Sequence, residues 1–205
     1  MNQQTASRLL GRLDRLATTR NTWLAYAPFA AVGTWLMVAD ARLQRLAPGL
    51  PKLDFRPAGY SPADVVRLFQ TYGPAGRAEY GQQTLVDTLF PVLVAAFGLL
   101  FFARTCRRWG WRGLGNLLIT GCLLFMVVDL AENACIFALL AQFPHPSWTA
   151  ATLGSLLTQL KLPLLFTIYF FVLLNALLLS GRLVRGWWRA LAETPCSDAA
   201  CGPRA

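Results

Sequence analysis

Four formally charged residues stand inside long apolar stretches of the sequence: Asp87, Asp129, Glu132 and Lys161. A charge at the centre of a bilayer costs at least about 2.5–3.5 kcal/mol, and such residues usually face a bundle interior and pair with one another. Carboxylates in a low-dielectric site bind protons near neutral pH, which suits them to acid–base work. We therefore predict Asp129, Glu132 and Asp87 as candidate catalytic acid–base groups.

Helical spacing places further polar side chains beside these charges. Asp129, Glu132 and Asn133 lie at i, i+3 and i+4, so they share one stripe of a helix. Thr158 and Lys161 share a stripe of a later helix. A lysine or arginine can hold an anionic headgroup or stabilise a developing negative charge. The predicted ligand-binding residues are Lys161, Asn133, Arg77, Tyr80 and Thr158.

Two prolines lie close to the charged residues. Pro91 cannot donate a hydrogen bond to the carbonyl of Asp87, and Pro163 leaves the carbonyl of Gln159 free in the same way. Kinked helices with free carbonyls beside charged side chains open polar cavities in membrane proteins. We expect a kink at each proline and a cavity beside them.

Four apolar segments must position these residues. Each is long enough to cross about 30 Å of hydrocarbon at about 1.5 Å per residue. Hydrophobic residues make up 55% of the chain and charged residues only 14%, whereas soluble domains carry about 25% charged residues. The predicted spans are about 23–39, 85–103, 114–140 and 155–179. The predicted fold is all-α: a four-helix transmembrane bundle with a long extracytoplasmic loop between its first two spans.

That outer loop, 40–84, is expected to carry a short amphipathic helix. Ser61-Pro62 followed by Asp64 is a strong helix start, and Gly73-Pro74 is expected to end the helix. We expect it to lie flat over the outer ends of the bundle.

Arginines set the expected orientation. The arm 1–22, the link between the second and third spans, and the tail 181–205 hold 12 basic residues, against six in the other loops. An excess of basic residues marks the cytoplasmic side, where they contact anionic lipids. Both termini are therefore predicted to be cytoplasmic, and helix lengths then place the four charged residues in the outer half of the bilayer. An arginine-rich, lysine-poor chain is associated with GC-rich bacterial genomes, so the expected location is a bacterial inner membrane.

We make a separate prediction for each end of the chain. The arm has leucines at helical spacing with arginines between them, which predicts an amphipathic helix on the inner leaflet. The last residues have no periodicity and are expected to be disordered. One alternative is a signal peptide cleaved near Ala39-Asp40-Ala41, which would leave three spans.

The composition also argues against several classes of site and function. The chain has five cysteines without a C-x-x-C motif and a single histidine. This argues against a thiol-oxidising enzyme and a Cys/His zinc site, so we predict no metal and no cofactor. The net charge of +9 is typical of nucleic-acid binders, but the arginines flank apolar segments, so no nucleic acid is predicted.

Several functions remain open. The first is a cavity that binds a membrane lipid or another hydrophobic small molecule, with or without proton-transfer chemistry, so that enzymatic activity is left undecided. The alternative is a non-catalytic scaffold or accessory subunit, in a homo- or hetero-oligomer, whose charges only fix helix packing. A proton pathway fits less well, because the inner half of the bundle is mostly apolar.

The four-span plan with acids inside the membrane resembles the sterol-isomerase and sigma-2-receptor superfamily in architecture and residue types. This resemblance implies chemistry on a lipid-soluble molecule. A structured first outer loop also resembles claudin-type proteins, but residues 41–84 lack the Trp and Cys residues expected there. No residue role is carried over from either family.

Overall fold

The computed structural model describes residues 11–192, except for the side chains of residues 183 and 186–192. The predictions of an amphipathic helix in residues 1–10 and of disorder in residues 193–205 lie outside the described residues. Within the described part every regular element is helical. The elements are α2 (Thr19–Leu46), the 3₁₀ turn η1 (Leu53–Phe55), α3 (Pro62–Asp87), α4 (Phe90–Arg108), α5 (Arg112–Gln142) and α6 (Trp148–Ala192).

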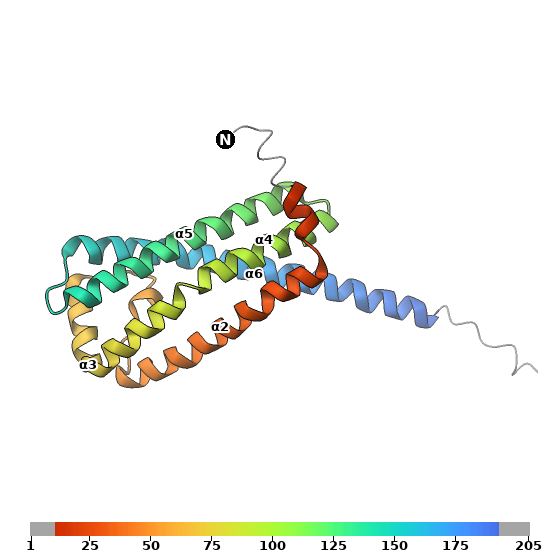
Figure 1. Ribbon diagram of the computed structural model, residues 1–205. Coiled ribbons are helices and arrows are strands. Elements are labelled where there is room, and N and C mark those ends of the chain that lie inside the picture. The colour runs from red at the N-terminus through yellow and green to blue at the C-terminus, as the bar shows by residue number, and fades with distance from the viewer. Residues whose placement is uncertain (1–10, 193–205) are drawn as a thin grey trace, which may run out of the picture.

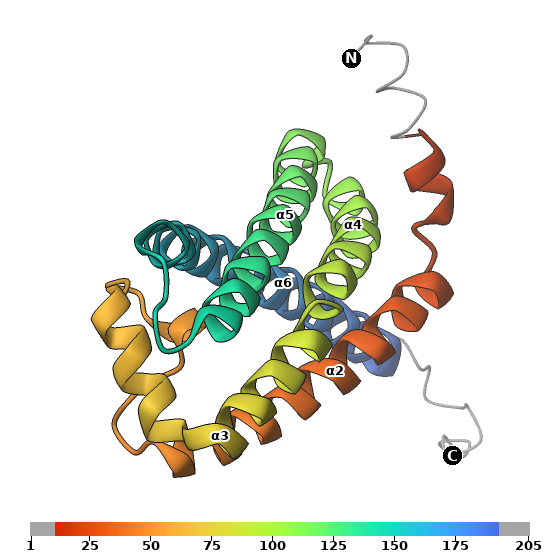
Figure 2. The ribbon, with the colours of Figure 1, turned by 60° about the vertical axis from the view of Figure 1, so that its left-hand side comes forward.

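Four helical segments are long and apolar enough to cross a membrane. They form an elongated bundle, in which α5 packs against both α4 and α6, and α2 packs against α4 and α3 (Figures 1 and 2). The segments are Thr19–Leu46, Pro62–Arg108, Arg112–Gln142 and Trp148–Arg182. The predicted all-α fold with four long apolar helices is thus present.

Helix α3 begins at the start signal in the sequence. The Ser61 side chain accepts a hydrogen bond from the Asp64 backbone nitrogen at 3.2 Å, and Asp64 Oδ2 accepts one from the Ser61 nitrogen at 2.8 Å. This reciprocal pair satisfies backbone donors that the first turn leaves free. At Gly73 the backbone leaves the helix with a φ of 63°, but Pro74 starts a new helical segment that runs on to Asp87. The helix that begins at Ser61 therefore ends at Gly73, as predicted, and a second helical segment follows it directly from Pro74.

The predicted second span, 85–103, is interrupted. Thr88 and Leu89 form a turn between α3 and α4, and Pro91 lies in the first turn of α4. A proline costs little there, because the first turn needs no intrahelical donor. The expected kink at Pro91 is therefore present as a break just before the proline, across which Thr88 and Leu89 keep helical backbone angles. Pro163, in contrast, lies inside α6.

Two apolar cores lie at opposite ends of the bundle. The loop-side core includes Leu43, Leu53, Phe69, Tyr80, Ile136 and Ala151. The arm-side core includes Val94, Phe102, Cys122, Phe125 and Ile168. Along α5, Phe125 belongs to one core and Ile136 to the other, so the residues between them form a separate layer.

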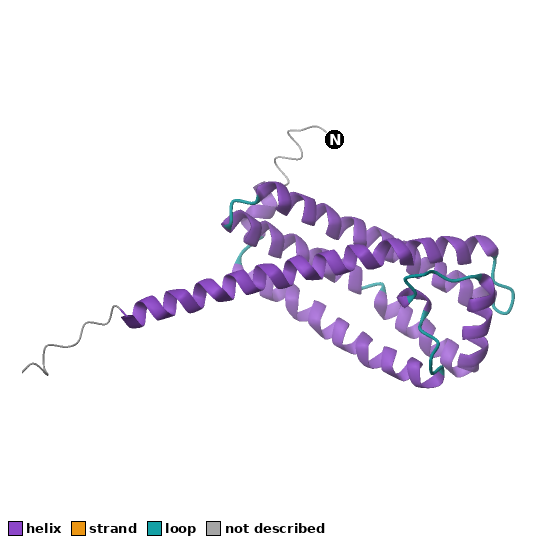
Figure 3. Cartoon of the chain, turned by 180° about the vertical axis from the view of Figure 1, so that it is seen from behind, coloured by secondary structure: helices purple, strands orange, loops and turns teal. Residues whose placement is uncertain are grey.

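The loop 47–61 is folded onto the helices, as the view from behind shows (Figure 3). Its turn η1 packs against α6, and Leu53 is completely buried. The Tyr60 nitrogen donates a hydrogen bond to Ser155 Oγ on α6 at 2.9 Å. A β-carbon on Gly59 would meet Ser155 and Gln159, so the loop approaches α6 as closely as a backbone can. This loop therefore closes one end of the bundle.

The described part of the arm packs against the other end. Residues 11–16 are helical, and Leu13 and the buried Ala17 belong to the arm-side core. Arg107 on α4 forms an ion pair with Asp14 at 3.0 Å. The arm is thus part of the packed bundle.

Candidate functional site

A layer of charged side chains separates the two apolar cores. On α5, Asp129, Glu132 and Asn133 are almost completely buried, and they lie between Phe125 and Ile136. Their shared stripe is therefore the inner face of α5, as the spacing predicts. This charged layer consists of Asp40, Lys52, Asp54, Asp87, Asp129, Glu132 and Lys161.

Lys161 is the centre of the first group in this layer. Its Nζ lies 2.7 Å from Asp129 Oδ1, and it also pairs with Glu132 Oε2. Thr158, one turn earlier on α6, donates a hydrogen bond to Glu132 Oε1. Four of the predicted site residues therefore meet across the interface of α5 and α6.

Lys52 is the centre of a second group, which the sequence analysis missed. Its Nζ lies 2.6 Å from Asp40 Oδ1 at the end of α2 and 3.1 Å from Asp54 Oδ2 in η1. Tyr80 on α3 donates a hydrogen bond to Asp54 Oδ1 at 3.2 Å, and Gln83 donates one to Asp40. The second group thus ties the loop to α2 and α3.

The two groups belong to one electrostatic unit. Asp54 interacts with both lysines, and Asp87 interacts with Asp129, Lys161, Asp54 and Lys52. Among the described residues, Asp87 has no ion-pair or hydrogen-bond partner of its own, and it is only partly buried. The layer contains five carboxyl groups and two ammonium groups, so that negative charge exceeds positive charge when all are ionised.

In the loop, neighbouring charges also shift the pKa values of Asp54 and Lys52. Burial opposes ionisation of Asp54, but the neighbouring Lys52 outweighs it and holds the pKa of Asp54 below its usual value. Burial alone would lower the pKa of Lys52, whereas Asp54 and Asp40 raise it above its usual value. Both groups are therefore charged at neutral pH.

Three polar side chains beside the ion pairs have atoms without a hydrogen-bond partner in the described part of the chain. Asn133 is completely buried, and neither its amide nitrogen nor its amide oxygen has a hydrogen-bond partner among the described residues. The same is true of the Tyr60 hydroxyl and of Gln83 Oε1 within that part of the chain. An unsatisfied buried polar group costs about 1–3 kcal/mol. The layer therefore offers both hydrogen-bond donors and acceptors that no described residue uses.

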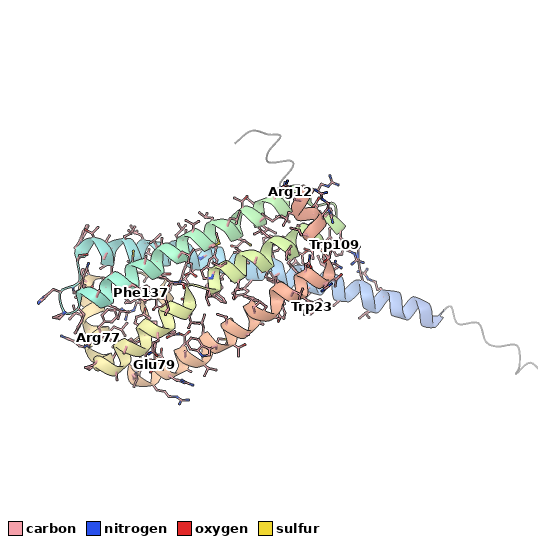
Figure 4. All side chains as sticks on the ribbon, in the orientation of Figure 1. Arg12, Trp23, Arg77, Glu79, Trp109 and Phe137 are labelled. Atoms are coloured by element: carbon pink, nitrogen blue, oxygen red, sulfur yellow. The ribbon has the colours of Figure 1, made fainter. Side chains whose placement is uncertain are left out.

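Two predicted ligand-binding residues have different surroundings. Tyr80 is buried and donates a hydrogen bond to Asp54 in the charged layer. Arg77 instead donates to the Phe69 carbonyl at 2.9 Å, and its guanidinium lies 4.2 Å from the centre of the Phe143 ring. It lies at the loop end of the molecule (Figure 4). Arg77 is thus not joined to the ion pairs.

The outer faces of the same helices are apolar. Met37, Val127, Leu156 and Leu160 are large, exposed side chains next to the charged residues in sequence. The charged layer therefore lies inside an apolar belt, which is the arrangement expected of a polar site within a membrane. Within the described residues, no group of three His, Cys, Asp or Glu side chains is placed to hold a metal ion.

One signal in the sequence would have identified Lys52. The chain has 17 arginines but only two lysines, Lys52 and Lys161. Both are almost completely buried, and each holds two carboxylates. An ammonium group is a compact point charge, whereas a guanidinium is a broad planar fork. The rarity of lysine thus coincides with the sites where a compact buried cation is required.

Comparisons of this chain with protein-family models, with curated proteins and with solved structures gave no match. The site must therefore be interpreted from its own geometry.

Proposed function

We propose that this is a multi-pass membrane protein that binds the polar end of a lipid-soluble or amphipathic small molecule at the charged layer. The observation that carries the proposal is the fully buried amide of Asn133, which has no partner among the described residues although it lies beside the Lys161 ion pairs. A side chain kept only for packing would gain stability by becoming apolar.

The charge balance supports a ligand of a particular kind. When all five carboxyl groups are ionised, the two ammonium groups do not neutralise them, and uncompensated charge in a low-dielectric interior is costly. A ligand group that donates hydrogen bonds or carries positive charge, such as a hydroxyl or an amine, would lower this cost. The unpaired acceptor atoms of Asn133 and Gln83 favour the same ligand chemistry.

Proton transfer is the chemistry that the layer would support. Glu132 accepts a hydrogen bond from Thr158 and forms an ion pair with Lys161, and Asp129 shares the same ammonium group. A proton can therefore move between a bound ligand and either carboxylate, with Lys161 holding the charge that develops. Asp87, which has no partner within the described residues, is the third candidate acid–base group.

The orientation is part of the proposal. Dense arginines at the arm end support a cytoplasmic location for that end, with both termini on the same side. Asp129 is 17 residues after Arg112, or about 26 Å along α5. In this orientation the charged layer would lie in the outer part of an approximately 30 Å hydrocarbon region.

Native mass spectrometry of the full chain in mild detergent tests the proposal. We expect the wild-type protein to retain a small molecule, and Glu132→Gln, which keeps the size of the side chain, to retain much less. Glu79→Gln is the matched control, because Glu79 lies on α3 and has no ion pair among the described residues. A wild-type protein without a ligand, or equal retention by Glu132→Gln and the control, would contradict the proposal.

A second candidate function is a scaffold in which the charges only fix the packing. It is favoured by the fact that each lysine has two carboxylate partners and that the pairs join α2, η1, α5 and α6. In that case Glu132→Gln would lower the unfolding temperature without changing what the protein retains. The same two samples therefore distinguish the two functions.

A further inference from the structure

A second site lies at the other end of the molecule. A groove of about 670 Å³ lies between α2, α4 and α6, and none of its lining residues belongs to the charged layer. We propose that this groove binds one phospholipid with an anionic headgroup, its phosphate against the arginines Arg104, Arg108 and Arg182 and an acyl chain along the aromatic wall. This proposal does not depend on the proposed function of the charged layer.

The wall from α4 changes from apolar to basic along its length. Phe97, Phe101, Arg104 and Arg108 follow one another at intervals of three or four residues, so they share one face of the helix. This stripe is 11 residues long, or about 17 Å. A groove that is aromatic at one end and cationic at the other matches an amphiphile with an anionic head.

The wall from α2 follows the same order. Thr19 and Thr22 line the groove at the basic end, and Tyr26 lines it at the apolar end. The Tyr26 and Phe97 rings lie 5.5 Å apart, which fixes the register of α2 against α4. The hydroxyl groups of the two threonines are therefore level with the arginines, where they can donate hydrogen bonds to phosphate oxygens.

The wall from α6 is graded in the same direction. Val172 and Ala176 line the apolar end, and Ser180 and Arg182 line the basic end. The Arg182 guanidinium stacks on Trp109, 3.7 Å from the ring centre, so its position is fixed before any ligand binds. All three helices thus contribute the same gradient from apolar to basic side chains.

Charge selects the headgroup. Three arginines and no acidic residue are found among the described residues that line the groove, and arginine forks bind phosphate oxygens in pairs. Trp23 and Trp109 lie at this end of the bundle (Figure 4), and tryptophans are enriched where a membrane meets water. The basic end of the groove is therefore at headgroup level, and its apolar end lies among the acyl chains.

Binding of defined lipids to the full-length protein in detergent tests the proposal. We expect phosphatidylglycerol to bind more tightly than phosphatidylcholine with the same acyl chains. Removing two arginines in Arg104→Gln/Arg108→Gln should weaken phosphatidylglycerol binding about thirtyfold. Arg12→Gln, which removes an exposed arginine at the same end but outside the groove (Figure 4), should leave it unchanged.

A second variant keeps the test decisive if the double variant does not fold. Ala176→Trp fills the apolar part of the groove without altering its charge, and it should weaken phosphatidylglycerol binding while Glu132→Gln should not. Equal affinity for the two lipids, an equal effect of Arg12→Gln, or no effect of Ala176→Trp would overturn the proposal. Displacement of the lipid by inorganic phosphate at equal concentration would overturn it as well, by showing that the site is for the free ion.

Discussion

Lys161 on α6 and Asp129 on α5 meet between two apolar cores, with 2.7 Å between Nζ and Oδ1. A buried ion pair of this kind is seldom more stable than apolar side chains of similar volume. The packing of α5 against α6 therefore does not explain why the pair is there. The pair does make the interface intolerant of losing either partner.

We expect Lys161→Met to lower the free energy of unfolding by about 3–5 kcal/mol, because Asp129 and Glu132 would be left buried without their counter-ion. The double variant Lys161→Met/Asp129→Leu should lose less than the sum of the two single variants, because the partners are removed together. Denaturant unfolding in detergent, followed by circular dichroism, measures both. Arg45→Met, at an exposed position, should change stability by no more than about 0.5 kcal/mol, and a similarly small effect of Lys161→Met would show that the ion pairs are not formed.

Lysine-to-arginine substitutions test whether the two buried sites require the compact ammonium group of lysine. Lys52→Arg and Lys161→Arg keep the positive charge but force a larger, planar group into sites where each side chain is only 7% exposed. We expect each to cost about 1–3 kcal/mol through overpacking. Thermal unfolding in detergent measures the loss, with Arg45→Lys as the surface control. Wild-type stability in both variants would refute the requirement for a compact ammonium group.

Two glycines with almost the same backbone conformation isolate the contact between the loop and α6. Gly49 and Gly59 have φ values of +79° and +78°, but a β-carbon on Gly49 would meet nothing within 4 Å, whereas one on Gly59 would meet Ser155 and Gln159. Alanine at either position carries a left-handed strain of about 1–2 kcal/mol. Gly59→Ala should therefore lose clearly more stability than Gly49→Ala. Equal losses would mean that the loop does not rest on α6.

The loop should also make the stability of the folded protein depend on pH. The folded-state pKa of Asp54 is below its usual value of 3.8, so its ionised form stabilises the fold. This contribution is fully present above the unfolded-state pKa and is lost as the pH falls through the folded-state pKa. Unfolding temperatures measured between about pH 6 and pH 3 should fall less steeply for Asp54→Asn than for the wild type. Parallel curves would contradict a charged Asp54 in the folded protein.

The sequence was most informative where periodicity repeats over many turns. Asp129, Glu132 and Asn133 could be placed on one buried face of α5 because side-chain spacing and helix geometry determine the face without tertiary contacts. Thr158 and Lys161 could be placed opposite them for the same reason. The start of α3 at Ser61 was predictable because a capping box is a local signal.

Features that depend on tertiary contacts were not predictable from local pattern. Lys52 and Asp54 lie in a loop whose short 3₁₀ turn is stabilised by packing on α6, so no periodicity reveals their burial. Arg77 was predicted as a ligand-binding residue, but the Phe143 ring, brought close by the end of α5, offers it a cation–π contact away from the ion pairs. The kink at Pro91 was expected, but its exact position at Thr88–Leu89 was not predictable, because Pro91 is compatible both with a kink and with a helix start.

The most direct test of a ligand site in the charged layer is the effect of Asn133→Leu on two quantities in one purified sample: the unfolding temperature and the retained small molecule. We predict that the variant loses the molecule, and that after complete ligand removal it unfolds at a higher temperature than the wild type, because an unsatisfied buried amide has been replaced by an apolar group. Asn175→Leu is the matched control, since Asn175 is also completely buried but donates to the Phe171 carbonyl on its own helix, and it should leave the retained molecule unchanged. Retention of the same molecule by wild type and Asn133→Leu would contradict the ligand site and leave the charged layer a packing element.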